Sequence, residues 1–177
     1  ALDCRESLDA GTSRRVVEHA IRFAQAVGLS ANDELTLTRA MLVRDIGKIR
    51  IANAVLLKDG LLDYDEWSLI HTHPRLGAEI LMETDSLKDA AEIVQNHHEC
   101  YDGTGYPNGI EGEEIPFMAR MAKIIDVYCA MTSARAYRKG HSTHEEAIEF
   151  IVSEKDKHFD SALVDIFVEA GVGETSV

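Results

Sequence analysis

Five groups in this 177-residue chain place imidazole, carboxylate or basic side chains at expected helix ends, in a loop, or within an apolar helix. Side chains at the ends of different helices can converge on a shared ion inside a helical bundle. Mixed nitrogen and oxygen ligands suit iron, manganese or a similar divalent metal, and a carboxylate that bridges two such ions supports water attack on a phosphodiester. The groups are Arg44-Asp45-Ile46-Gly47-Lys48, His71-Thr72-His73-Pro74, His97-His98-Glu99, Asp102-Gly103-Thr104-Gly105-Tyr106-Pro107-Asn108-Gly109, and Asp126 within an apolar run.

A structural interpretation competes with the metal interpretation for each group. A helical aspartate among apolar neighbours, such as Asp126, more often caps a helix or forms a salt bridge, and His73 at a helix joint is as often a hydrogen-bonding residue. The His97-His98 doublet is harder to explain in this way, because adjacent helical residues point about 100° apart and one of them should face inward. Spacing alone leaves both interpretations open. The other histidines, which we expect on solvated helix faces, are His19, His141, His144 and His158.

Helices joined by short connections are the elements expected to position these groups. Apolar residues recur at helical spacing from Arg14 to Val27, and Ser30 with Asp33 opens a second helix that runs to Ile46 and stops at Gly47. Residues 100–116 contain four glycines and two prolines, too many for a helix interior, and predict one long structured loop. The pattern predicts one all-α domain over residues 1–177. Further helix starts are expected at Asp63 with Glu66, Pro74, Ser86, Pro116, Ser142 with Glu145, and Asp160.

Composition and charge restrict the compartment and the partners. The formal net charge of −13 argues against binding to DNA, RNA or an anionic membrane. No apolar run is long enough to span a bilayer and no signal peptide opens the chain, so we expect no membrane insertion. The odd number of cysteines (Cys4, Cys100 and Cys129) favours reduced thiols and a cytoplasmic location. Because the chain opens at Ala1 in a helix-like stretch, we expect a domain excised from a longer signalling protein.

Taken together, the motifs resemble the HD-GYP family of bacterial, metal-dependent cyclic di-GMP phosphodiesterases. "RDIGKI" stands where that family has His-Asp-Ile-Gly-Lys-Ile, and residues 11–16 match its opening block, Gly-His-Ser-x-Arg-Val. The resemblance extends from about Gly11 to Gly171, and the Gly105-Tyr106-Pro107 segment is its most specific part. The later blocks, which match in order and spacing, are "HTHPRLGAEIL", "NHHECYDGTGYPNGIEGEEIP" and "DVYCAMTSARAYRKG".

The resemblance implies an HD-domain-like helical bundle with a long GYP loop, and it assigns roles to individual residues. Asp45 would be a catalytic, metal-bridging carboxylate, and Lys48 would act on the reacting phosphate. The dinucleotide, cyclic di-GMP, would be contacted by Gly105, Tyr106 and Arg135, and Arg138 stands at a usually basic position. The further metal ligands implied are His73, His97, His98 and Asp126.

Several positions depart from the family pattern. Thr12 and Arg44 replace two ligand histidines, and Leu8 replaces a glutamate that accompanies a third metal. Cys129 replaces an aspartate that resembles a guanine-contacting residue. One metal of the usual pair would take Thr12, Arg44, Asp45 and Asp126. A threonine hydroxyl is a poor ligand and arginine does not deprotonate, so this set is damaged.

The other metal would take Asp45, His73 and His97, and this set is intact. We therefore expect at most one divalent metal, with iron or manganese the best fit, and allow for none.

Arg44 has two interpretations. Its guanidinium could lie between Asp45 and Asp126 and take the place of the lost cation's charge, or it could point to solvent from the helix end.

Two functional hypotheses follow. The first is an active metal-dependent phosphodiesterase that hydrolyses the 3'-5' bond of cyclic di-GMP. The second, which the damaged ligand set favours, is a signalling module with weak or no hydrolysis. Such a module would use its fold and GYP loop to bind a nucleotide or a protein partner.

Overall fold

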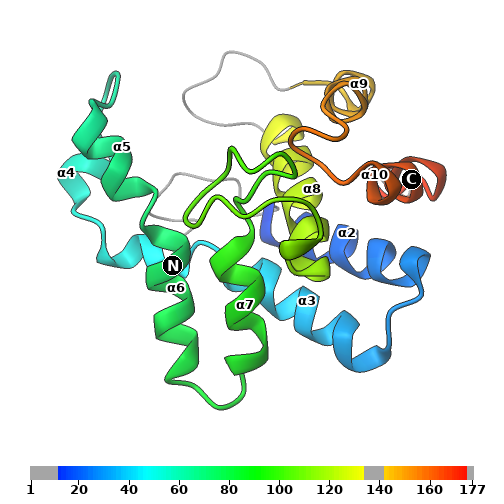
Figure 1. Ribbon diagram of the computed structural model, residues 1–177, viewed down its shortest axis with the longest axis horizontal. Helices are drawn as coiled ribbons and strands as arrows, with labels where there is room; N and C mark the ends of the chain where they lie inside the picture. Colours follow the sequence, from blue (N-terminus) through cyan, green and yellow to red (C-terminus); the bar gives the residue numbers. More distant parts are fainter. Residues whose placement is uncertain (1–11, 134–141, 175–177) are drawn as a thin grey trace.

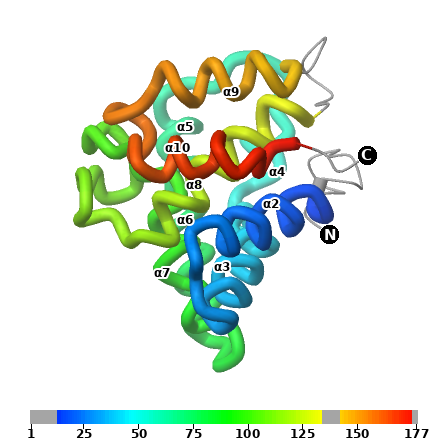
Figure 2. The backbone as a smooth tube through the Cα atoms, turned by 90° about the vertical axis from the view of Figure 1, so that its right-hand side faces the viewer, coloured from blue at the N-terminus to red at the C-terminus, as the bar shows by residue number. Residues whose placement is uncertain are grey.

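The computed structural model describes residues 12–133 and 142–174, and within these ranges the chain is helical with no named strand. The expected all-α class is therefore confirmed. Figures 1 and 2 show the helices arranged around α8, with α2, α3, α6 and α7 on one side and α9 and α10 on another. The elements are α2 (Thr12–Val27), α3 (Ala31–Val43), η1 (Ile46–Arg50), α4 (Asn53–Leu56), α5 (Tyr64–Ile70), α6 (His73–Met82), α7 (Lys88–Asn96), η2 (Gly112–Glu114), α8 (Phe117–Thr132), α9 (His144–Ser153) and α10 (Ser161–Glu169).

Several helix starts form at the predicted capping residues. Asp63 accepts a hydrogen bond from the Glu66 backbone N–H while the Glu66 side chain accepts one from the Asp63 N–H, which completes a capping box at α5. Ser30 caps α3 and Asp160 caps α10, in each case through a side-chain oxygen that accepts backbone N–H groups. Pro116 directly precedes α8, as expected.

Other boundaries differ from the prediction. The capping box of α9 is formed by Thr143 and Glu146, one residue beyond the predicted pair of Ser142 and Glu145. The helix predicted to start at Ser86 begins at Lys88, and no side chain caps it. Pro74 is the second residue of α6 rather than the first, because the helix already begins at His73. Finally, α3 ends at Val43 instead of Ile46.

The core is formed where α2, α3, α7 and α8 meet. Fully buried side chains from these helices include Phe23, Leu37, Met41, Val94 and Ile125. α6 lies beside α7 in Figure 1 and also packs against η1. Among residues 12–133 and 142–174, no helix combines the length and the apolar character needed to cross a membrane.

Gly47 brings η1 into direct contact with the beginning of α6. A β-carbon at this position would lie 2.0 Å from the His73 carbonyl oxygen and 2.6 Å from the Gly77 nitrogen, so only glycine fits. This close approach places η1, which directly follows Asp45, against the start of α6 at His73.

Candidate metal centre

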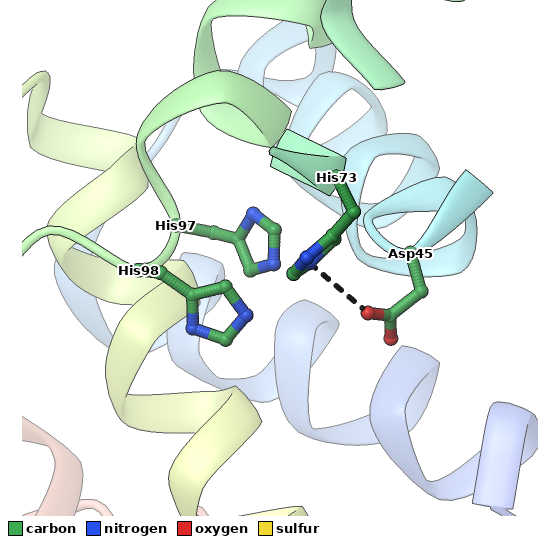
Figure 3. A group of neighbouring side chains, drawn as sticks. All are labelled: Asp45, His73, His97 and His98. Carbon is green, nitrogen blue, oxygen red and sulfur yellow. Dashed lines mark ion pairs between the residues drawn. The ribbon is translucent and has the colours of Figure 1, made fainter. Parts of the chain in front are cut away.

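Four of the five residues predicted as metal ligands converge on one point. Asp45 follows α3, His73 begins α6, and His97 and His98 follow α7. Their ligand atoms all lie within 4.8 Å of one another. Figure 3 shows the three imidazole rings and the carboxylate directed toward a common centre. The group could hold a metal ion, and its nitrogen and oxygen donors fit a divalent first-row metal.

Backbone carbonyls orient two of the rings. His73 Nδ1 is 2.8 Å from the Ile70 oxygen, and His97 Nδ1 is 2.6 Å from the Val94 oxygen. A bond to a carbonyl requires the proton on Nδ1, which leaves Nε2 with a free lone pair in the neutral ring. Both Nε2 atoms are buried and have no hydrogen-bond partner among the described residues. Two such acceptors facing a carboxylate form the arrangement found where backbone carbonyls orient metal-binding histidines.

The protonation states also suit a cation. Burial lowers the pKa of His97 to about 4 and holds the pKa of His98 well below its ordinary value. Burial opposes the ionisation of Asp45, but the charges of Arg44 and Lys48 outweigh it and hold the pKa of Asp45 well below its usual range. Lys48 Nζ lies 3.0 Å from Asp45 Oδ1. At neutral pH the centre therefore presents neutral imidazoles and one carboxylate.

The buried histidines predict that metal-free protein loses stability on acidification. In the unfolded chain His97 takes up a proton near pH 6.5, whereas in the folded chain it does so only near pH 4. The unfolded state therefore binds more protons in this window, so the free energy of unfolding should fall as the pH drops from about 6.5 to about 4. At 1.36 kcal/mol per pKa unit, His97 alone contributes a fall of about 3 kcal/mol.

Denaturant unfolding at several pH values, with metal chelated, measures this slope. His97→Gln should reduce the proton uptake on unfolding by about one, while His158→Gln, which changes a histidine outside the group, should not. If His97→Gln leaves the pH dependence of the free energy of unfolding unaltered, His97 is not the residue that causes it.

Arg44 lies between the two carboxylates instead of pointing to solvent. Its Nε is 2.6 Å from Asp126 Oδ1 and its Nη2 is 3.5 Å from Asp45 Oδ2. A further bond joins Nη1 to the Met41 carbonyl oxygen at 2.8 Å. Burial would raise the pKa of Asp126, but Arg44 outweighs both burial and the repulsion from Asp45, so this pKa is lowered. Asp126 is thus paired with a guanidinium and does not belong to the four-residue group, although it was predicted as a fifth ligand.

The GYP loop covers one side of the centre with an aromatic ring. Tyr106 is half-buried and stacks on His71 at 3.9 Å and on His98 at 4.8 Å between ring centroids. Trp67 continues this row of rings, 5.6 Å from His71. Gly105 packs its Cα against the Glu99–Cys100 backbone, where a β-carbon would come within 2.2 Å of the Cys100 nitrogen.

Glu99 is a positioning residue that the sequence analysis did not assign. Its carboxylate is buried and accepts hydrogen bonds from the backbone N–H groups of Asn108, at 2.8 Å, and Gly109, at 3.1 Å. The far end of the GYP loop is thereby attached to the residue that follows His98. The signal available in the sequence was a carboxylate directly after the histidine doublet and before a glycine-rich loop.

The remaining predicted residues lie either outside the described residues or away from the metal centre. Arg135, Arg138 and His141 lie outside the described residues, and Thr12 is the first residue of α2 with a side chain that is not described. The prediction that His19 is solvated was wrong, because its ring is 5% exposed and bonds the Val172 carbonyl oxygen at 2.8 Å. His144 is half-buried, with Nδ1 2.9 Å from the Tyr128 hydroxyl, so it is not simply solvated either.

The fold and this centre define an HD domain. The family model described as "HD domain" matches residues 2–163, so the chain belongs to that family. It is 33% identical over 171 residues to 3'3'-cGAMP-specific phosphodiesterase 2 of Vibrio cholerae, covering 96% of this chain and 33% of that protein. It is 38% identical over 165 residues to the cyclic di-GMP phosphodiesterase response regulator RpfG of Xanthomonas campestris, covering 90% and 43%.

A solved structure agrees with this assignment at the level of the fold. The cyclic GMP-AMP-specific phosphodiesterase V-cGAP3 of V. cholerae superposes with a TM-score of 0.73 at 21% identity, covering 95% of this chain and 45% of that one. The resemblance to HD-GYP phosphodiesterases is thus confirmed. The chain spans less than half the length of each of these three proteins.

Proposed function

We propose that this chain is an HD-GYP-type domain that binds a cyclic dinucleotide, holds at most one divalent metal, and hydrolyses its ligand weakly or not at all. The observation that carries the proposal is the guanidinium of Arg44, bonded to Asp126 and close to Asp45. By resemblance to the family, these two carboxylates would otherwise share a metal. A fixed cation there neutralises them but offers no open coordination position.

Asp45, His73, His97 and His98 are the residues that would hold the single ion. A divalent ion held there would supply Lewis-acid polarisation of a phosphoryl oxygen. Lys48, beside Asp45, would hold positive charge against the phosphate, and Tyr106 would close the site on the loop side. Arg44 remains protonated throughout, since Asp126 and Asp45 outweigh burial and raise its pKa, so it can stabilise negative charge but cannot accept a proton.

The second candidate is an active phosphodiesterase acting on the 3'-5' bond of cyclic di-GMP or a related dinucleotide. The intact group of Asp45 with three histidines, and the position of Lys48, favour it. The GYP loop, attached to Glu99 by two hydrogen bonds, is a surface that either function would use for a nucleotide or a protein partner.

Metal analysis combined with binding and turnover assays distinguishes the two candidates. Protein reconstituted anaerobically with Fe(II) or Mn(II) should retain no more than one ion per chain by elemental analysis, because one complete ligand set is present. His97→Ala should abolish that uptake, while His158→Ala should leave it unchanged. Calorimetry with cyclic di-GMP and 3'3'-cGAMP should detect binding, and chromatography should detect little product. Two stoichiometric ions, or efficient turnover by the unmodified chain, would overturn the proposal.

A further inference from the structure

A cavity with a mixed polar and apolar lining lies between α2, α8 and the beginning of α9, and none of the four residues of the metal centre lines it. Its volume is about 420 Å³, and its lining includes Arg15, Cys129, Thr132, Ser133, Ser142 and Thr143. Small-molecule sites usually measure about 300–1,000 Å³. Cys129 follows Asp126 by one turn of α8, so the cavity adjoins the Arg44–Asp126 pair.

Arg15 supplies the positive charge of this cavity. The guanidinium is half-buried, and its Nη2 donates to the Ser133 hydroxyl at 3.0 Å. Within residues 12–133 and 142–174 no carboxylate lies in ion-pair distance of it, although the chain has 31 acidic residues and only 18 lysines and arginines. Other arginines do find carboxylates: Arg14, Arg44, Arg50, Arg75 and Arg120. Arg15 thus keeps its capacity for an anion.

Most of the groups around Arg15 are neutral. Five hydroxyls line the cavity, on Tyr128, Thr132, Ser133, Ser142 and Thr143. Those of Tyr128 and Thr132 donate to the carbonyl oxygens of Gly173 and Tyr128, so the serine hydroxyls of Ser133 and Ser142 are the donors for a ligand. Burial raises the pKa of the Cys129 thiol to about 12, so it carries no negative charge at neutral pH. Glu174 also lines the cavity, but its carboxylate lies against Gly171, where a β-carbon would be 3.2 Å from Oε2.

We propose that this cavity is an anion site, separate from the metal centre, that binds a phosphoryl group, with Arg15 as the charged partner and the Ser133 and Ser142 hydroxyls as further donors. A guanidinium fork with hydroxyls on two other elements matches an anion with several oxygens better than a spherical halide. The phosphoryl group has two sources, inorganic phosphate and a nucleotide. The cavity volume leaves room for the latter.

The site is tested with inorganic phosphate at constant ionic strength and with EDTA present, so that the metal centre does not contribute. Phosphate should raise the melting temperature of the wild-type protein, and calorimetry should give a dissociation constant. Arg15→Gln should weaken phosphate binding at least tenfold. Arg39→Gln is the matched control, since Arg39 is an exposed arginine of α3 bonded to the Ser86 carbonyl, and it should bind as wild type. Ser142→Ala, a milder change in the same cavity, should weaken binding severalfold.

Two results would overturn the proposal: no phosphate-dependent shift in the wild-type protein, or equal phosphate affinity of folded Arg15→Gln and wild type. If Arg15→Gln does not fold, unaltered affinity of Ser142→Ala decides against the site. Cyclic di-GMP distinguishes the sources. A tenfold loss of dinucleotide affinity in Arg15→Gln, with competition by phosphate, assigns the phosphoryl group to the nucleotide. Loss of phosphate binding alone assigns it to the free anion. Because these measurements use no metal and no turnover, they can fail while the proposed function stands.

Discussion

Replacing Arg44 with alanine should destabilise the folded protein by about 3–5 kcal/mol, the usual scale for breaking a buried ion pair. The Arg44 and Asp126 side chains are each 15% exposed, and they share a 2.6 Å bond. Without the guanidinium, Asp126 and Asp45 face each other as uncompensated like charges. The free energy of unfolding, measured in urea under chelating conditions, gives the size of the effect.

Two comparison variants isolate the charge effect. Arg50→Ala removes an arginine whose pair with Glu79 is more than 40% exposed on both sides, so it should cost less than about 1 kcal/mol. Adding Asp126→Asn to Arg44→Ala removes the stranded charge and should recover part of the loss. If Arg44→Ala is as harmless as Arg50→Ala, Arg44 does not substitute for a cation.

The double substitution Thr12→His with Arg44→His should restore the ligand set that the family resemblance implies. Metal content should rise from at most one ion to two per chain, and hydrolysis of cyclic di-GMP should appear or increase at least tenfold. The physical reason is that imidazole binds a divalent metal, whereas a threonine hydroxyl and a guanidinium do not. Elemental analysis is the cleaner measurement, because Cys129 remains in place of the aspartate implied to contact guanine.

Each single substitution serves as a control for this experiment. Arg44→His alone, or Thr12→His alone, leaves the second ligand set incomplete and should fall short of two ions. Arg44→Lys retains the charge without adding a ligand and should stay at one ion or none. A double variant that folds but takes up no additional metal would show that the second site needs more than these two side chains.

Local sequence signals predicted the helices well and their boundaries less well. Asp63 with Glu66 predicted α5 because both halves of a capping box lie within four residues. At α9 two candidate capping pairs are offset by one residue, and the sequence pattern alone could not distinguish Ser142–Glu145 from Thr143–Glu146. The contact of Gly47 with His73 joins residues that are 26 positions apart in sequence, so no local rule could predict it.

The centre was predictable to the extent that it depends on residue type. Asp45, His73, His97 and His98 were expected together, and they converge. The orientation of their rings was not predictable, because it is set by carbonyls of Ile70 and Val94. The exposure of His19 was mispredicted for a similar reason. His19 is on a helix face that looks solvated in sequence, yet the Val172 carbonyl oxygen and the Tyr128 ring, both far away in sequence, lie against it.

The row of aromatic rings that ends at His98 allows the intrinsic fluorescence of Trp67 to report on the metal centre. Trp67 is the chain's single tryptophan, it is 50% exposed, and only His71 and Tyr106 separate it from a residue of the metal centre. Its emission therefore arises from one known place and depends on how those rings stack. Ion uptake at His98, or a ligand that displaces Tyr106, would alter the emission intensity without any attached dye. Stopped-flow fluorescence could thus follow, in real time and on unlabelled material, events that equilibrium assays record only as end points.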